Sequence, residues 1–411
     1  MTDLMINQNL PHLMHVDLNS CFATIEQQAY PHLRGKPIVI AAYKTDKGCI
    51  LSPSIEAKKL GIKTGMRVFE AKQIYSNIIV RNTDPELVRD VNSKFMKIFQ
   101  DYSPKVIPKS IDEAIIDFSP VFSETTDLIT IGKEIKSRLR KEIGEWISCN
   151  VGIATNRFLA KLAASLHKPD GLDFIDYKNL KQVYSVVKLT DLNGINIRFE
   201  LRLNMNGINN PIDFFQASES LLRKNIFQSI AGYYWYMRLR GWEIDNFEST
   251  RKSFGQEYSL KEKTKDPEKL KKIIMKLCEK MGRRLRKSNQ LSSAIHLGIL
   301  YQDYSFWHKG KKIDQSISST KELFNNIMIL FFLQPKINTV SKISVSCFSL
   351  TKNNNHQLTL IDLGEEKINK ISNALDKIND RFGEFTMIPA TMMNMEDTVI
   401  DRIAFGKSGL L

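Results

Sequence analysis

The sequence predicts an α+β fold, with helices on one face of a mostly antiparallel sheet. The run at residues 13–18 is short and almost entirely apolar, which is typical of a buried central strand. Helical patterns separate the expected strands, but the order is not the strict alternation of a doubly wound parallel sheet. At 411 residues, 42% of them hydrophobic, the chain is long enough for two to four domains of ~150 residues.

The first half of the chain carries most of the sheet. Its expected strands span residues 13–18, 36–40, 110–118 and 148–153. Its expected helices span residues 23–30, 128–143 and 158–166, with a helical turn at 55–60 that Gly61 ends. A longer amphipathic helix opens at Asp84-Pro85 and runs to Phe99, because Asp and Pro both favour helix N-termini.

The second half separates into a helical part and a strand-rich part. Short helical patterns with stops at Gly194 and Gly207 extend from about residue 177 to 242. A self-contained βαββαβ unit follows, with strands at 253–260, 293–301, 311–319 and 342–350 and helices at 267–287 and 321–332. A further helix is expected at 366–382.

The charge of the chain indicates a polyanionic partner. Its 59 basic and 45 acidic residues give a net charge of +14. Residues 251–290 hold fourteen Lys or Arg against five Asp or Glu, and in helix 267–287 a basic stripe lies beside the apolar face: Lys269, Lys272, Lys276, Arg283 and Lys287. A solvated helix face is the alternative explanation for such a run of lysines.

Cysteine usage and hydropathy favour the cytoplasm. The five cysteines are far apart and have no CxxC or CxxH spacing, which argues for a reducing compartment and against a zinc site. No apolar run approaches the ~18–20 residues of a membrane helix, so no membrane partner is expected.

Three acids stand where two apolar strands end or begin. Asp17 ends the first strand, and Asp112-Glu113 opens a later one. If the two strands are neighbours, the carboxylates converge, and their repulsion calls for hard divalent cations such as Mg²⁺. Two such ions can hold the attacking and leaving oxygens of a phosphoryl transfer. The alternative is that Asp17 caps a strand end and the acid pair lies on a surface turn.

Three motifs give a family resemblance. They are Asp17-Leu18-Asn19-Ser20-Cys21-Phe22-Ala23, Ser110-Ile111-Asp112-Glu113-Ala114, and a Gly152–Ala163 string followed by Lys168-Pro169-Asp170-Gly171. In order and spacing they resemble the signatures of Y-family translesion DNA polymerases, with features of the bacterial polymerase IV and polymerase V branches. The resemblance implies a right-hand polymerase fold and template-directed addition of dNTPs to a primer during DNA damage bypass and repair.

The resemblance also implies roles for particular residues. Asp17, Asp112 and Glu113 would be catalytic and would hold two Mg²⁺ ions, with the Leu18 carbonyl completing one coordination sphere. Four residues would contact the dNTP: Cys21, Phe22, Lys58 and Lys161. Phe22 would act as a steric gate against the ribose 2′-hydroxyl. In the fingers motif Ile55 and Lys58 replace a Tyr and an Arg, and Lys cannot make the bidentate contact of a guanidinium.

The resemblance divides the chain into a palm (1–28 and 83–170), fingers (29–82), a thumb (171–246), a linker (247–252), a little finger (253–350) and a C-terminal segment (351–411). In the thumb Asn196 replaces the second Gly of a helix-hairpin-helix turn. The C-terminal segment contains a string that resembles the pentapeptide by which bacterial proteins bind the sliding clamp: Gln357, Leu358, Thr359, Leu360 and Ile361.

The expected partners are therefore primer-template DNA, dNTPs and a sliding clamp of the beta type. We expect a monomer, and the need for a regulatory subunit stays open. Two other functions stay as alternatives: a catalytically silent DNA- or clamp-binding factor, which the departures in fingers and thumb favour, and a palm-fold nucleotide cyclase. A cyclase has no reason to carry a basic βαββαβ domain and a clamp motif.

Overall fold

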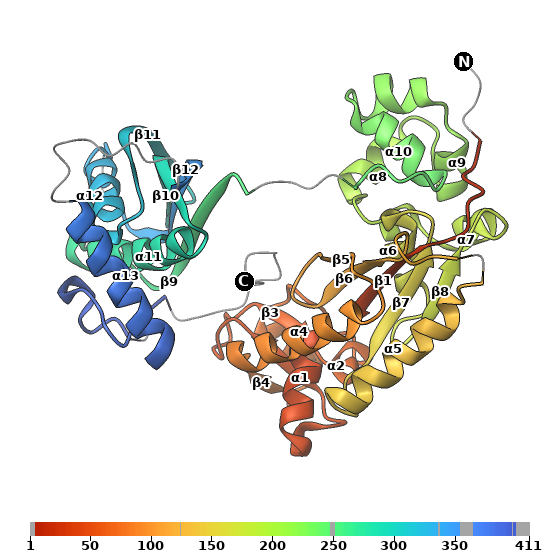
Figure 1. The fold of residues 1–411 in the computed structure, drawn as a ribbon, viewed down its shortest axis with the longest axis horizontal. Helices are drawn as coiled ribbons and strands as arrows, with labels where there is room; N and C mark the ends of the chain where they lie inside the picture. Colours follow the sequence, from red (N-terminus) through yellow and green to blue (C-terminus); the bar gives the residue numbers. More distant parts are fainter. Residues whose placement is uncertain are drawn as a thin grey trace. The chain divides into compact units, whose positions relative to one another are not determined.

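The computed structural model describes residues 5–123, 125–246, 251–335, 338–353, 365–396 and 398–399. These residues form two compact units, 5–246 and 251–399, and each has hydrophobic cores of its own. Figure 1 shows the elements of each unit. Within the described residues, no helix has both the length and the apolar character needed to span a membrane.

The first unit is built on a five-stranded sheet of order β5-β6-β1-β7-β8. Its strands are β1 (Leu13–Leu18), β5 (Val106–Pro108), β6 (Glu113–Asp117), β7 (Cys149–Ala154) and β8 (Leu172–Ile175). The central strand β1 pairs antiparallel with β6 and β7, and only β7 and β8 are parallel. The mostly antiparallel sheet is therefore as predicted, and the apolar run 13–18 is its middle.

Helices cover both faces of this sheet, so the expectation of helices on one face is wrong. On one face α1 (Cys21–Ala29), α4 (Pro85–Gln100) and α5 (Leu128–Glu142) share a core with Met14 and Val16 of β1. On the other face α6 (Arg157–Leu166) packs against β7. A Cβ on Gly152 would lie 2.1 Å from the Ala160 carbonyl oxygen, so this glycine permits the close approach of α6.

A smaller three-stranded sheet of order β3-β2-β4 belongs to the same unit. Its elements are η1 (Pro31–Leu33), β2 (Ile38–Ala41), β3 (Ile50–Pro53), α2 (Ile55–Lys59), α3 (Val68–Ile74) and β4 (Ile79–Arg81). It has a separate apolar core around Val39, Ile50 and Val68. The sequence predicted β2 and α2 here, but not the short β3, α3 and β4.

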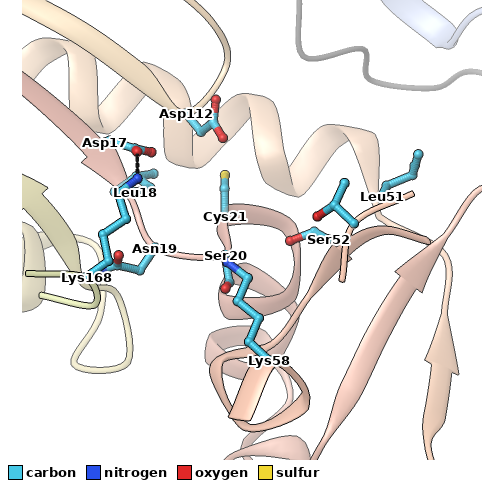
Figure 2. A pocket seen from close by; sticks show the side chains of 11 residues that line it. Asp17, Leu18, Asn19, Ser20, Cys21, Leu51, Ser52, Lys58, Asp112 and Lys168 are labelled. Atoms are coloured by element: carbon cyan, nitrogen blue, oxygen red, sulfur yellow. Dashed lines mark hydrogen bonds and ion pairs between the residues drawn. The ribbon is translucent and has the colours of Figure 1, made fainter. Parts of the chain in front are cut away.

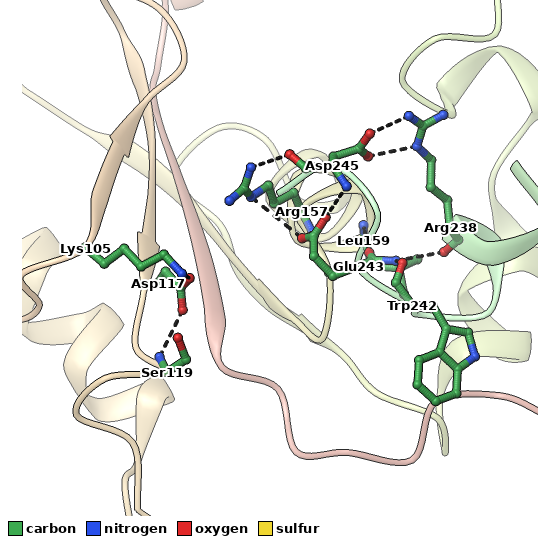
Figure 3. Close-up of polar contacts among 10 residues, drawn as sticks. Lys105, Asp117, Ser119, Arg157, Leu159, Arg238, Trp242, Glu243 and Asp245 are labelled. Atoms are coloured by element: carbon green, nitrogen blue, oxygen red, sulfur yellow. Dashed lines mark hydrogen bonds and ion pairs between the residues drawn. The ribbon is translucent and has the colours of Figure 1, made fainter. Parts of the chain in front are cut away.

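The rest of the first unit is helical: α7 (Leu180–Val186), η2 (Leu189–Asp191), α8 (Ile197–Asn204), α9 (Pro211–Gln216), η3 (Leu221–Ile226) and α10 (Ala231–Leu239). Phe214, Phe227 and Trp235 stack in its core. The chain after α10 returns to α6, where the Glu243 carboxylate accepts a 2.9 Å hydrogen bond from the Arg157 amide (Figure 3).

The second unit contains a βαββαβ arrangement, as predicted. Its elements are β9 (Ser253–Thr264), α11 (Pro267–Lys287), β10 (Gln290–Tyr301), β11 (Phe306–Ile317), α12 (Thr320–Phe331) and β12 (Val340–Lys352). The sheet order is β11-β10-β12-β9, and every neighbouring pair is antiparallel. The bounds of α11 agree with the predicted helix, because Asp266 caps it and Pro267 opens it.

A C-terminal layer covers part of α11, and this corrects the picture of a solvated basic stripe. The layer consists of α13 (Glu365–Phe382) and the following residues to 399, including η5 (Ala390–Met392), and Met392 and Val399 enter the core of the second unit. Lys276 is buried and donates to the Met395 carbonyl at 2.7 Å. Arg283 pairs with Asp376, Asp380 and Glu384. Of the stripe, Arg283 is thus neutralised within the unit and Lys276 is buried, while Lys269 and Lys287 remain exposed.

Candidate active site

The three predicted acids converge at the end of β1. The register of β1 and β6 places Asp17 directly opposite Glu113. The Leu18 amide donates to the Asp112 carbonyl at 2.9 Å, which holds Asp112 beside the same strand end. The strand expected from 110 begins only at Glu113, because the amides of Lys109 and Ser110 both turn back to the Glu113 carbonyl. Asp112 therefore lies in the turn between β5 and β6.

Each carboxylate has its own polar partner. Glu113 Oε2 accepts hydrogen bonds from His15 Nε2 at 3.1 Å and from Lys161 Nζ at 2.7 Å. Asp17 pairs with Lys168, and Asp112 accepts a 2.5 Å hydrogen bond from the Ser110 hydroxyl. Two of the three acids are thus neutralised by lysines, while the partner of Asp112 is a hydroxyl.

The pKa values of the acids reflect these surroundings. Burial raises the pKa of Asp112, and the charges of Asp17 and Glu113 raise it further, although the Ser110 hydroxyl opposes the change. Burial acts in the same direction on Glu113, but the hydrogen bonds from His15 and Lys161 outweigh it and lower the pKa to about 2. The negative charge that lacks compensation is therefore concentrated around Asp112.

A pocket of about 340 Å³ opens beside Asp17 and Asp112 (Figure 2). Its lining comes from both sheets of the first unit: Asp17, Leu18, Asn19, Ser20, Cys21, Leu51, Ser52, Lys58, Thr64, Asp112 and Lys168. Burial lowers the pKa of Lys58, and the charge of Lys168 lowers it further, so the two cations share one electrostatic environment. A pocket lined by two acids and two lysines suits a metal-bound polyphosphate.

The structure brings together some of the predicted residues and not others. Leu18, Cys21 and Lys58 line the pocket together with Asp17 and Asp112. Phe22 is fully buried in the core around β1 and does not line the pocket, whereas Cys21, the preceding residue of α1, does. Lys161 lies against Glu113 instead of lining the pocket. The predicted clamp-binding residues Gln357, Leu358, Leu360 and Ile361 lie outside the described residues.

Lys168, Ser52 and Thr64 line the pocket without having been singled out as site residues. The Lys-Pro-Asp-Gly string that contains Lys168 was visible in the sequence, but its place beside Asp17 depends on the loop between α6 and β8. Ser52 and Thr64 carry no local motif. The pairing of β2 with β3, which defines the small sheet, is what carries Ser52 to the pocket.

The donor set fits hard divalent cations, although the present side-chain positions do not form a metal cluster. Within the described residues, no three His, Cys, Asp or Glu side chains are grouped so that they could hold an ion as they stand. Two carboxylates beside a carbonyl are the oxygen ligands that Mg²⁺ prefers. Burial is the main cause of the raised pKa of Asp112, the charges of Asp17 and Glu113 add to it, and a cation would favour the charged carboxylate. The buried Ser20 hydroxyl, also in the lining, lacks a hydrogen-bond partner among the described residues.

Comparisons with known proteins identify relatives of this chain. The impB/mucB/samB family model matches residues 16–165, and the C-terminal domain model of that family matches residues 251–360. DNA polymerase IV of Pelotomaculum thermopropionicum is 28% identical over 404 residues, which cover 97% of this chain and 99% of that protein. DNA polymerase IV of Staphylococcus aureus is 26% identical over 356 residues, covering 85% and 98%.

Solved structures show the same fold. A Y-family DNA polymerase chimera superposes with a TM-score of 0.69 at 25% identity, covering 83% of this chain and 99% of the chimera. The Dbh DNA polymerase superposes with a TM-score of 0.59 at 24% identity. The α+β polymerase fold and the enzyme class, a DNA-directed DNA polymerase of the translesion class, are thereby confirmed. With matches in both halves of the sequence and across most of the fold, the chain belongs to the Y family of DNA polymerases.

Proposed function

We propose that this protein adds dNTPs to a primer 3′ end by two-metal-ion phosphoryl transfer, with Asp17, Asp112 and Glu113 as the catalytic carboxylates. The observation that carries the proposal is the pairing of β1 with β6, which sets Asp17 opposite Glu113 and beside Asp112. The surroundings of these acids differ, because lysines neutralise two of them while the partner of the buried Asp112 carboxylate is the Ser110 hydroxyl. Such a cluster is costly without a cation.

Two Mg²⁺ ions would be held by these three carboxylates and by the Leu18 carbonyl. When bound, they supply electrostatic stabilisation of the attacking and leaving oxygens. The chain's own part is to hold the acids at a strand end, where the sheet fixes their backbone. His15 contributes by fixing the Glu113 carboxylate from the neighbouring strand at 3.1 Å.

Lys58 and Lys168 are the cations that we assign to the incoming triphosphate. Both line the pocket, with the ammonium group of Lys168 against Asp17, and both lysines would act as point charges on phosphate oxygens. Lys161, which the sequence also predicts to reach the triphosphate, contacts Glu113 at 2.7 Å, and we propose that it also positions this acid. Cys21 borders the bound nucleotide in this proposal, and the Phe22 ring behind it excludes a ribose 2′-hydroxyl.

The partners follow from the same site. Dbh was solved as an insertion ternary complex, which supports binding of primer-template DNA and dNTPs by this chain. The positive charge of residues 251–290 would attract the phosphate backbone even where intramolecular pairs neutralise part of it. A sliding clamp would bind at Gln357, Leu358, Leu360 and Ile361, and we place the monomeric enzyme in the bacterial cytoplasm.

Primer extension on undamaged and abasic templates, with Mg²⁺ or with EDTA, tests this function. We expect extension that needs the metal, and a loss of well over tenfold in Asp17→Ala and Asp112→Ala with DNA affinity kept. Asp90→Ala is the matched control, because Asp90 is an exposed acid that pairs with Lys94 of the same helix. Extension that survives EDTA, or a loss below tenfold in both site variants, would contradict the proposal.

A further inference from the structure

The loop that carries Lys168 to the pocket is held by contacts that lie outside the pocket. Residues 167–171 connect α6 to β8, and only Lys168 of this loop lines the pocket. Its ammonium group contacts Asp17, as Figure 2 shows. A lysine has many rotamers, so its position over a site depends on how firmly its backbone is held.

Two cations of α5 hold this loop through Asp170. Arg140 donates to one oxygen of the Asp170 carboxylate, and Lys136 lies 3.2 Å from the other. Lys136 also donates to the carbonyl of Asp170 at 2.5 Å and to that of Gly171 at 3.3 Å. The Lys136 side chain is only 13% exposed, so these bonds are partly shielded from water. The Asp170 carboxylate and two main-chain carbonyls thus fasten the loop to a helix that is not part of the pocket.

Buried amides join the same loop to the strand that carries the catalytic acid. The Gly171 amide donates to Asn150 Oδ1 at 2.8 Å, and Asn150 Nδ2 donates to Asn19 Oδ1 at 2.6 Å. Asn150 lies opposite Asp17 in the register of β7 and β1, and Asn19 is in the pocket lining. The loop is therefore held on one side by charge and on the other by neutral hydrogen bonds.

We propose that Asp170 is a positioning residue for triphosphate binding: held by Lys136 and Arg140, it fixes the loop from which Lys168 reaches the phosphates. The inference rests on the proposed function, since it assigns Lys168 to the incoming dNTP. Binding costs less when a side chain is ordered beforehand, because its rotamers need not be frozen by the ligand. Removing the tether should therefore weaken dNTP binding and leave the chemical step intact.

Asp170→Asn is the informative substitution. Asp170 has a φ of +62°, a left-handed conformation that Asp and Asn both adopt more readily than other side chains. The amide keeps this backbone and removes the charge that Arg140 and Lys136 bind. Asp173→Asn is the matched control, because Asp173 lies three residues further on and pairs with His167 at 2.7 Å. Neither residue is part of the pocket lining.

Steady-state primer extension separates positioning from simple damage. We expect Asp170→Asn to raise KM for dNTP by about three- to tenfold, with kcat and primer-template affinity close to those of the unaltered enzyme. Asp173→Asn should leave KM unchanged. If Asp170 acts through Arg140, Arg140→Gln should raise KM similarly, and the double variant should be no worse than either single one.

Hydrogen exchange of the free protein gives a readout that does not depend on activity. Backbone amides of residues 170–173 should exchange faster in Asp170→Asn and normally in Asp173→Asn. An unchanged KM, or equal losses in kcat and DNA affinity, would overturn the positioning role. Absence of metal-dependent extension by the unaltered enzyme would contradict the proposed function and, with it, the role of Lys168. Unchanged hydrogen exchange in Asp170→Asn would contradict only the role of Asp170 in holding the loop.

Discussion

The ion pair between Lys161 and Glu113 should be worth about 1 to 2 kcal/mol of stability to the first unit. The lowering of the Glu113 pKa from 4.5 to about 2 corresponds to about 3 kcal/mol in favour of the charged form. His15 and Lys161 share this effect, and Lys161 is 35% exposed while Glu113 is 17% exposed, so the share of Lys161 is discounted for solvent. Lys161→Met should therefore lower the free energy of unfolding by about 1–2 kcal/mol.

The dependence on pH has a definite sign. A carboxyl whose pKa is lower in the folded state contributes stability above its unfolded pKa. That contribution is complete above pH 4.5 for Glu113 and is lost as the pH falls toward about 2. The difference between the unaltered protein and Lys161→Met should thus be constant from pH 7 to about 5 and should shrink below that value.

Urea unfolding of the full chain measures this effect. Trp146, Trp235 and Trp242 belong to the first unit, so a Trp307→Phe background makes tryptophan fluorescence report that unit alone. Glu113→Gln and the double variant complete a cycle with an expected coupling of about 1 kcal/mol. Lys94→Met, which breaks an exposed pair with Asp90, should cost no more than about 0.5 kcal/mol. Additive effects of Lys161→Met and Glu113→Gln would refute the reasoning.

Three other predictions concern different parts of the chain. Phe22→Ala should admit ribonucleotides with little change in deoxynucleotide use, and unchanged discrimination between dATP and ATP would leave Phe22 as a core residue only. Arg286 binds both oxygens of Asp376, at 2.6 and 2.8 Å. Arg286→Met should therefore lower the free energy of unfolding by about 3 kcal/mol or more and expose the C-terminal layer to proteases, whereas Arg381→Met should not. Clamp-stimulated extension should be lost, with clamp-free extension kept, when three residues become Ala: Gln357, Leu358 and Leu360. Loss of basal activity in that variant would instead mark a structural strand.

The features predicted best from the sequence are those that depend on a local pattern of residues. Helix α11 could be bounded to the residue, because Asp266-Pro267 marks its start and an apolar face runs along it. The convergence of the acids depends on strand pairing, yet each acid stood at the end of an apolar run, and that position was a usable signal. The family motifs then joined these local observations to one site.

Features that depend on distant contacts could not be predicted. The close approach of α6 depends on Gly152, whose missing side chain is only meaningful once α6 is known to lie there. The basic stripe of α11 was visible, but not the carboxylates of Asp376 and Asp380, about a hundred residues further along the chain, that pair with Arg283. Lys161 and Lys168 are both near the third motif, and only the fold distinguishes the one on Glu113 from the one in the pocket.

Asn196, which replaces the second Gly of the helix-hairpin-helix turn, changes what this turn can offer to a phosphate. Asn196 caps α8, and its side-chain oxygen accepts hydrogen bonds from the amides of Arg198 at 3.1 Å and Phe199 at 3.0 Å. Free amides at a helix N-terminus are what a glycine-rich turn offers to a phosphate. Here the protein's own side chain already occupies two of them, so a DNA phosphate would have to displace it. We therefore expect Asn196→Gly to strengthen primer-template binding and steepen its dependence on salt, measured by fluorescence anisotropy, although it weakens the helix. Unchanged affinity in that variant would show that this turn does not meet the DNA backbone.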